Sequence, residues 1–157
     1  MSKLLLATIA AALAFVAPAA AQDTKIELSA VPKNVMDAAV KAAPGFAASS
    51  ANTEMEDGKT IFELQGTVGD KKVEVDVLED GTLDEVETEI EVSALPKAAT
   101  DAVMAKMPAF APTKVEESVR TAGTFYEIEG MDGANKMDVE IMADGSSMKA
   151  EAMKAGN

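Results

Sequence analysis

The stretch Glu27-Leu-Ser-Ala-Val-Pro-Lys33 returns 64 residues later as Glu91-Val-Ser-Ala-Leu-Pro-Lys97. The correspondence continues at the same spacing, without a gap, almost to the end of the chain. Further matched pairs are Asp37 and Asp101, Pro44 and Pro108, Phe46 and Phe110, Glu63 and Glu127, Gly66 and Gly130, Val75 and Val139, and Asp80-Gly81 and Asp144-Gly145. A correspondence held along a whole unit indicates duplication of one small structural unit. The sequence therefore predicts two units, 22–87 and 88–157.

Each unit is predicted to begin with a helix. Pro32 and Pro96 precede alanine-rich stretches whose apolar residues recur at helical spacing. Proline suits the first turn of a helix because no amide hydrogen is needed there. Pro44 and Pro108 then end the helices, since a proline inside a helix removes a hydrogen bond and clashes with the preceding turn.

The rest of each unit alternates between apolar and polar residues, which is typical of strands with one buried face. The predicted strands are 60–66, 72–77 and 83–90 in the first unit and 124–130, 136–141 and 148–153 in the second, with weaker ones at 51–55 and 115–119. Asp80-Gly81 and Asp144-Gly145 are hairpin turn signals. The predicted fold class is α+β: two tandem repeats, each with one helix packed on a three- or four-stranded antiparallel sheet. Because a 64-residue unit buries little surface alone, the halves are expected to share a core or a continuous sheet.

The first 21 residues have the pattern of a secretory signal peptide. Lys3 precedes an apolar run from Leu4 to Val16, and Ala19-Ala20-Ala21 offers a cleavage site. The apolar run is short for a membrane span. We predict that residues 1–21 are removed and that the remaining chain is periplasmic or secreted, with no membrane attachment.

Composition excludes several functions. The chain has no histidine and no cysteine, which removes the usual catalytic triads, zinc sites and iron–sulfur clusters. We expect no enzymatic activity and no cofactor. The net charge of −13 repels nucleic acid and anionic lipid, and it favours cationic partners or metal ions. The same charge is also explained by solubility alone.

The residue pattern Leu-Pro-Lys, Asp-Ala, Pro-x-Phe, Phe/Tyr-Glu-Leu/Ile, a V-x-V strand and Asp-Gly resembles the PepSY-like repeat. The specific likeness is to its tandem form, grouped with β-lactamase-inhibitor-like proteins, and it covers residues 24–151. The matching residues mark helix ends, a strand and a turn. The resemblance implies a small exported binding or inhibitory module whose curved antiparallel sheet clamps a partner.

The strand alternation also predicts an acidic sheet face opposite the helices. Its predicted members are Ile61, Glu63, Glu74, Asp76, Phe125, Glu127, Glu129, Asp138 and Glu140. The functional interpretation is a docking surface for a basic exported protein or peptide, with Phe125 and Ile61 as apolar anchors. The alternative is an ordinary solvated face, on which charged residues are expected.

Cation binding is the competing function. Clustered carboxylates from Asp80 to Glu85 suggest Ca²⁺, although the ligand spacing of a calcium loop is missing and a hairpin turn explains them better. Met104 and Met107 suggest Cu(I), because soft thioethers bind it. Methionine as a filler of the core, as expected for Met137, explains these residues better.

Overall fold

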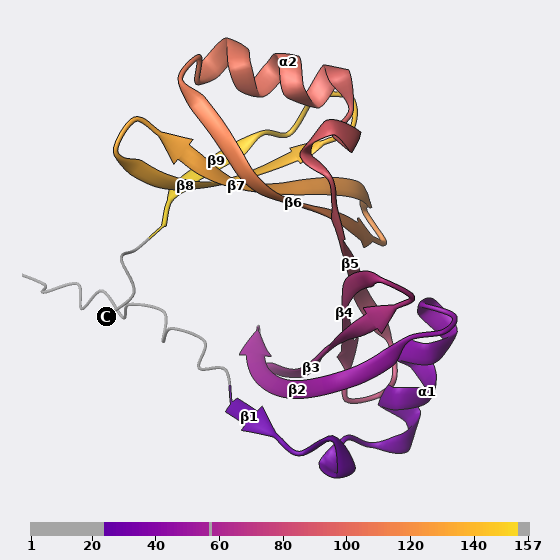
Figure 1. The fold of residues 1–157 in the computed structure, drawn as a ribbon. Coiled ribbons are helices and arrows are strands. Elements are labelled where there is room, and N and C mark those ends of the chain that lie inside the picture. Colours follow the sequence, from indigo (N-terminus) through magenta and orange to yellow (C-terminus); the bar gives the residue numbers. More distant parts are fainter. Residues whose placement is uncertain (1–23, 57, 154–157) are drawn as a thin grey trace, which may run out of the picture.

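The computed structural model describes residues 24–56 and 58–153. Its strands form one antiparallel sheet in which spatial order follows chain order (Figure 1). The strands are β1 (Thr24–Ile26), β2 (Ala47–Glu56), β3 (Lys59–Val68), β4 (Lys71–Leu78), β5 (Leu83–Ile90), β6 (Phe110–Arg120), β7 (Gly123–Asp132), β8 (Asn135–Met142) and β9 (Lys149–Ala152). The predicted signal peptide, residues 1–21, lies outside the described residues.

The predicted fold class is wrong, because the halves do not form two separate helix-on-sheet units. Strand β5 pairs with β4 along one edge and with β6 along the other, so a single nine-stranded sheet runs through the chain. The β5–β6 register places Glu85 opposite Arg120 and Ile90 opposite Val115. The edge of an unpaired strand exposes backbone hydrogen-bond donors and acceptors. Pairing between β5 and β6 satisfies these backbone groups on the facing edges of both strands. The expectation of a continuous sheet is therefore correct, and that of two sheets is not.

The helices lie where the prolines predict them. Helix α1 (Lys33–Ala42) follows Pro32, and α2 (Lys97–Lys106) follows Pro96. A short 3-10 turn precedes each helix: η1 (Leu28–Ala30) and η2 (Val92–Ala94).

Both helices pack on the same face of the sheet, over two apolar clusters. Val35 and Ala39 of α1 lie on a cluster that includes the β3–β4 pair Leu64 and Val75. In the other half, α2 lies on a cluster with these members: Ala99, Val103, Phe110, Val115, Tyr126, Ile128, Val139 and Ile141. Apolar side chains on alternate strand positions thus bury one sheet face under the helices.

Two glycines allow the ends of β2 and β6 to approach their partners closely. A Cβ atom on Gly66 would lie 2.2 Å from the Ala47 carbonyl oxygen, and one on Gly130 would lie 2.5 Å from that of Ala111. The pairing register shifts beside each glycine, which marks a bulge in the ladder. The matched glycines of the sequence are therefore required by packing.

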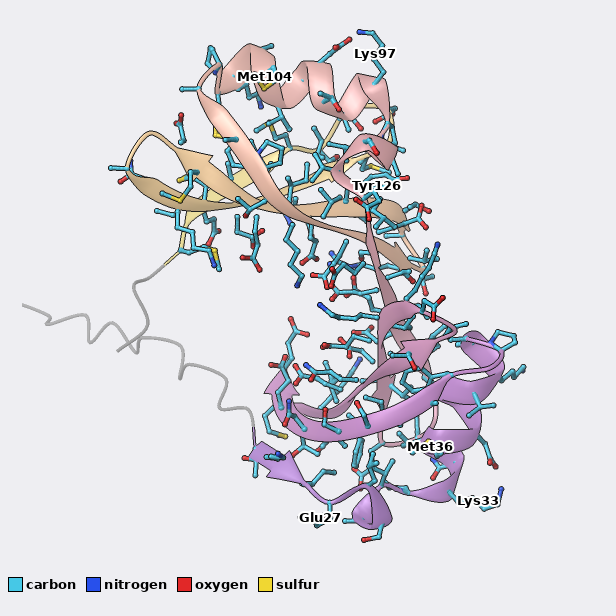
Figure 2. The ribbon with its side chains drawn as sticks, viewed as in Figure 1. Glu27, Lys33, Met36, Lys97, Met104 and Tyr126 are labelled. Atoms are coloured by element: carbon cyan, nitrogen blue, oxygen red, sulfur yellow. The ribbon has the colours of Figure 1, made fainter. Side chains whose placement is uncertain are left out.

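The sheet bends strongly about β5, and the helices lie on the outer side of the bend (Figure 1). Helix α2 and β6–β9 form the upper half of the view, and α1 and β1–β4 form the lower half. The sheet face without helices is therefore on the inner side, where polar side chains from both halves gather (Figure 2). None of the described helices is long and apolar enough to cross a membrane.

Candidate docking face

The inner surface of the sheet, from β3 to β8, is called the acidic face here. Successive residues of a strand point to opposite sides of the sheet, and residues paired across neighbouring strands point to the same side. The acidic face therefore consists of the paired residues that point away from the helices. Its carboxylates are Glu63, Glu74, Asp76, Glu85, Glu87, Glu89, Glu116, Glu127, Glu129, Asp138 and Glu140. Its basic residues are Lys72, Lys114, Arg120 and Lys136. Carboxylates therefore outnumber cations on this surface by more than two to one.

All the carboxylates that the sequence predicts for the site lie on this face. The sheet register sets Glu63 opposite Asp76 in the first half, and Glu127 opposite Glu140 in the second. The remaining predicted carboxylates are paired as follows: Glu74 lies opposite Gln65 and Glu87, and Asp138 lies opposite Glu129. The alternation argument is therefore correct on placement, and the binding role of these residues stays a prediction.

The two predicted apolar anchors differ from expectation. Ile61 is only 5% exposed, so it is not an exposed anchor. Phe125 is half-buried, and the guanidinium carbon of Arg120 lies 5.2 Å from its ring centroid. A cation over an aromatic face is an attractive arrangement, so the exposed surface above Phe125 is shared with a positive charge. The alternation of residues predicts to which side of the sheet these side chains point. It does not predict which other side chains contact them, because those contacts depend on the bend of the sheet.

Four glutamates lie opposite one another across four adjacent strands. Glu89 of β5 faces Glu116 of β6, which faces Glu127 of β7, which faces Glu140 of β8. Like charges directly opposite each other destabilise a sheet. This row is called the glutamate ladder here, and each of its glutamates forms an ion pair with a basic residue. Lys72 Nζ lies 2.8 Å from Glu89 Oε2, and Lys114 Nζ lies 2.7 Å from Glu116 Oε2.

Arg120 neutralises the rest of the glutamate ladder. Its Nη1 donates to Glu140 Oε2 at 2.5 Å, and its Nη2 donates to Glu127 Oε1. Its Nε donates to Glu85 Oε1 at 2.6 Å, and Glu85 also accepts from the buried hydroxyl of Ser118. One guanidinium thus connects β5, β6, β7 and β8. Burial by itself would raise the pKa of Glu140. Hydrogen bonds from Lys149 and Arg120 outweigh burial and hold this pKa below its usual range.

A second group of carboxylates on the same face has no such partner. Glu74 and Asp76 lie on β4, and Glu87 lies opposite Glu74 on β5. These three residues are called the central triad. Within the described part of the chain, no lysine or arginine forms an ion pair with any of them. Glu74 accepts a hydrogen bond of 2.9 Å from Gln65 Nε2, whereas Asp76 Oδ1 is buried without a hydrogen-bond partner.

The environment of the central triad favours its neutral forms. Burial, reinforced by Glu74, Glu63, Glu85 and Asp84, raises the pKa of Asp76 to about 8. Burial and then the charges of Glu127, Glu85, Glu116 and Glu74 raise the pKa of Glu87 well above its usual range. Burial also raises the pKa of Glu74, against the opposing effects of the Gln65 hydrogen bond and the charge of Lys114, which acts on Glu87 as well. Desolvation and like charges both disfavour ionisation.

Sequence reasoning missed the contribution of β5 and β6 to this face. Arg120, Glu85 and Glu87 are not among the predicted residues, because the predicted face draws only on the strands 60–66, 72–77, 124–130 and 136–141. The alternation Glu85-Val-Glu-Thr-Glu89 is a signal that could have found the β5 carboxylates. The alternative of an ordinary solvated face stays open, and the carboxylates of β5 and of the central triad are half-buried on it.

The competing cation sites are placed as follows. Asp80 Oδ1 accepts a 2.8 Å hydrogen bond from the Thr82 amide, which is the role of an aspartate in a turn. Met104 is 40% exposed, whereas Met107 packs on the apolar cluster under α2, so the two thioethers lie in different environments. Met137 lies against the same cluster, as its core-filling role predicts.

Three carboxylates do approach one another closely enough to hold a cation. Ligand oxygens of Glu85, Glu87 and Glu127 lie within 4.8 Å of each other. Arg120 already contacts two of these residues, Glu85 and Glu127. Arg120 therefore supplies positive charge to Glu85 and Glu127, whereas Glu87 forms no ion pair with it.

Comparison with known proteins identifies relatives by structure alone. No family model matches the sequence, and no curated protein matches it. A DUF2874 family protein from Bacteroides uniformis superposes with a TM-score of 0.62 at 13% identity, covering 77% of this chain and 88% of that one. A BLIP-like protein from Bacteroides fragilis gives a TM-score of 0.59 at 18% identity, covering 80% and 89%.

The chain has a BLIP-like fold. A third similar structure, with a TM-score of 0.56 at 15% identity, is a protein from Bacteroides eggerthii that is predicted to be periplasmic; it covers 78% of this chain and 88% of that one. At these identities the likeness establishes the fold, not the activity. The inhibitor-like part of the predicted resemblance agrees with this fold, whereas the PepSY-like and tandem-repeat parts remain predictions.

Proposed function

We propose that the chain is an exported, non-catalytic binding module that docks a basic extracytoplasmic protein or peptide on its acidic face and thereby inhibits or regulates it. The observation that carries the proposal is the central triad. Glu74, Asp76 and Glu87 are half-buried carboxylates held together without an ion pair to any basic residue in the described part of the chain, at a cost in stability. Strongly perturbed groups of this kind are concentrated at functional sites.

The shape of the sheet supports the same function. A stable protein interface buries about 800 Å² on each partner, which is much for a 64-residue unit to offer alone. The β5–β6 ladder joins the inner surfaces of both halves into one, so a single partner can contact strands on either side of the bend. The BLIP-like neighbour supports a binding or inhibitory role over a catalytic one. The absence of histidine and cysteine from the sequence also supports a non-catalytic role.

Electrostatics would act mainly on the rate and specificity of encounter. An acidic surface attracts a basic partner over several ångströms and speeds association, and dissolved salt screens the attraction. We therefore expect association to slow as ionic strength rises.

Site-specific photo-crosslinking in an envelope extract of the producing organism tests the proposal. A photoreactive residue replaces Gln65, which is exposed on the acidic face, and in a matched control replaces Val40, which is 44% exposed on α1. We expect an adduct with a basic protein or peptide from position 65 alone, and less of it in high salt. Equal adducts from both positions, adducts indifferent to salt, or no adduct from position 65 would contradict the proposal.

A further inference from the structure

Some carboxylates of the acidic face form ion pairs with basic residues and others do not. This difference indicates where a cation from a partner would bind. In the glutamate ladder, Glu89 and Glu116 are each bound by a lysine, and Glu127 and Glu140 by Arg120. The central triad adjoins this ladder on β4 and β5 and forms no ion pair with the described basic residues. Asp138 of β8 also forms no ion pair with a described basic residue, but it is a single carboxylate, whereas β4 and β5 bring three together. Charge complementarity therefore directs the positive group of a partner to β4 and β5.

The face itself shows which kind of cation it accommodates. Arg120 places a planar guanidinium among carboxylates from three strands, with hydrogen bonds of 2.6 Å to Glu85 and 2.5 Å to Glu140, over the ring of Phe125. Guanidinium presents five donors in a fixed plane and is more weakly hydrated than an ammonium group. It therefore suits a half-buried set of carboxylates spread over neighbouring strands.

Asp76 provides a second, separate observation. Its Oδ1 atom is buried and accepts no hydrogen bond. Buried polar atoms are nearly always paired, and an unpaired one calls for an explanation such as an absent ligand. The neighbouring groups on β3, β4 and β5 are Glu63, Glu74, Glu85 and Asp84, all of them acidic. The charges that act most strongly on Asp76 are therefore all negative.

A hollow on the same face leaves room beside the triad. It has a volume of about 360 Å³ and is lined by strands β2 to β6, with Gln65, Glu74, Glu89 and Glu116 in its wall. Lys72 and Lys114 also line it, and both are held by glutamates of the ladder. The hollow therefore gives an incoming side chain access to Glu74 at the edge of the triad.

We infer that the basic partner is held by an arginine side chain seated between β4 and β5, on the carboxylates of Glu74, Asp76 and Glu87. This inference rests on the proposed docking function and adds the position and the chemical class of the group that is recognised. The arginine occupies the first half of the face as Arg120 occupies the second. Binding ionises the triad, so it releases protons, and affinity rises between about pH 6 and pH 9.

The test uses capped arginine, N-acetyl-arginine-methylamide, as the probe and records amide chemical shifts of the ¹⁵N-labelled protein. Capped citrulline is the neutral control of the same shape, and capped lysine tests the need for a planar group. We expect saturable shifts on β4 and β5 with arginine, weaker shifts with lysine and none with citrulline. No saturable shift with about 50 mM capped arginine, or the same shifts with citrulline, would overturn the inference.

Variants locate the seat. Asp76→Asn and Glu87→Gln should each weaken arginine binding by about tenfold, since hydrogen bonds to charged groups are strong. Both replacements keep side-chain shape, so the fold should persist. Asp37→Asn removes the same charge from the exposed surface of α1 and should leave binding unchanged. Equal loss in the Asp37 control, or no loss in the two triad variants, would overturn the inference.

The outcomes separate this inference from the proposed function. If crosslinks form at Gln65 but capped arginine shifts residues of β6–β8, the docking function stands and the arginine seat is wrong. If no crosslinks form at position 65 while capped arginine binds β4 and β5, the docking function is wrong and only the arginine-binding position is supported. If CaCl₂ produces the saturable shifts and arginine does not, the triad holds a metal ion and the inference is overturned.

Discussion

Two neighbouring regions of one sheet face are built from the same residue type and reach opposite electrostatic states. The glutamate ladder across β5–β8 is bound by Lys72, Lys114 and Arg120, whereas the central triad on β4 and β5 has no basic partner among the described residues. In the first region, hydrogen bonds to basic side chains hold the pKa values of Glu89 and Glu140 below their usual range, although burial raises that of Glu127. In the second region, burial raises the pKa values of all three carboxyl groups. The comparison teaches that the positions of neighbouring cations, rather than the number of carboxylates, decide which part of an acidic surface can bind a basic partner.

Removing Arg120 should erase the difference between the regions. The Arg120→Ala variant leaves Glu85, Glu127 and Glu140 partly buried without their shared cation, as in the central triad. Removal of one partner of such a network is strongly destabilising, so we expect a loss of about 3 kcal/mol in unfolding free energy by urea titration. Lys72→Ala, which affects a more exposed pair, should cost less than about 1 kcal/mol. Similar losses in both variants would contradict the distinction.

Neutralising Asp76 should stabilise the protein, with a defined dependence on pH. The pKa of Asp76 is about 8 in the folded state, against an ordinary value of 3.8. Between these values the folded state binds a proton that the unfolded state releases, so stability falls as pH rises from about 4 to about 8. Asp76→Asn removes this loss and should add about 2 kcal/mol at pH 8 and little at pH 4.

Thermal unfolding of wild type and Asp76→Asn across this pH range measures the effect. Asp37→Asn is the matched control, because that carboxylate is 62% exposed on α1. A stabilisation by Asp76→Asn that is equal at pH 4 and pH 8 would show that the carboxyl group is not neutral in the folded protein.

Supplying an internal arginine should convert the second region, the central triad, into a copy of the first, the glutamate ladder. Position 56 lies opposite Lys59 at the end of β2, as Arg120 lies opposite Gly123 at the end of β6, 64 residues later. Glu56→Arg should reach Glu63 and Asp76, stabilise the protein by about 1 kcal/mol, and weaken binding of capped arginine. Glu27→Arg makes the same charge change on an exposed residue near α1 and should do neither. Unchanged arginine binding in Glu56→Arg would place the seat elsewhere.

The smallest effect is expected for the helix salt bridges. Lys33 with Asp37 and Lys97 with Asp101 form ion pairs of 2.6 Å, with the lysines 86% exposed and turned away from the sheet (Figure 2). Exposed pairs at this helical spacing contribute little, so Lys33→Ala and Lys97→Ala should change unfolding free energy by less than about 0.5 kcal/mol. A larger change would show that charge on the helix side of the sheet also matters.

Much of the molecule can be predicted from local sequence. The prolines at 32 and 96 locate the starts of both helices, and the period-two pattern locates β3, β4, β5, β7 and β8. The same pattern places Glu63, Asp76, Glu127 and Glu140 on one side of the sheet. It cannot show that Ile61 is covered or that Arg120 lies over Phe125, because those contacts depend on the curvature of the sheet.

The sequence by itself determined the type of the two helices and of the main strands, which side of a strand is apolar, and the acidic character of the surface. These features follow from short-range periodicity and composition. Tertiary structure alone decided that β5 joins the halves into one sheet. It also decided that Arg120 reaches Glu85, Glu127 and Glu140, while Asp76 Oδ1 has no hydrogen-bond partner among the described residues. Strand pairing and burial are long-range properties. Residues far apart in the chain meet only when the sheet bends about β5, and the same bend excludes water from the carboxylates on the inner face.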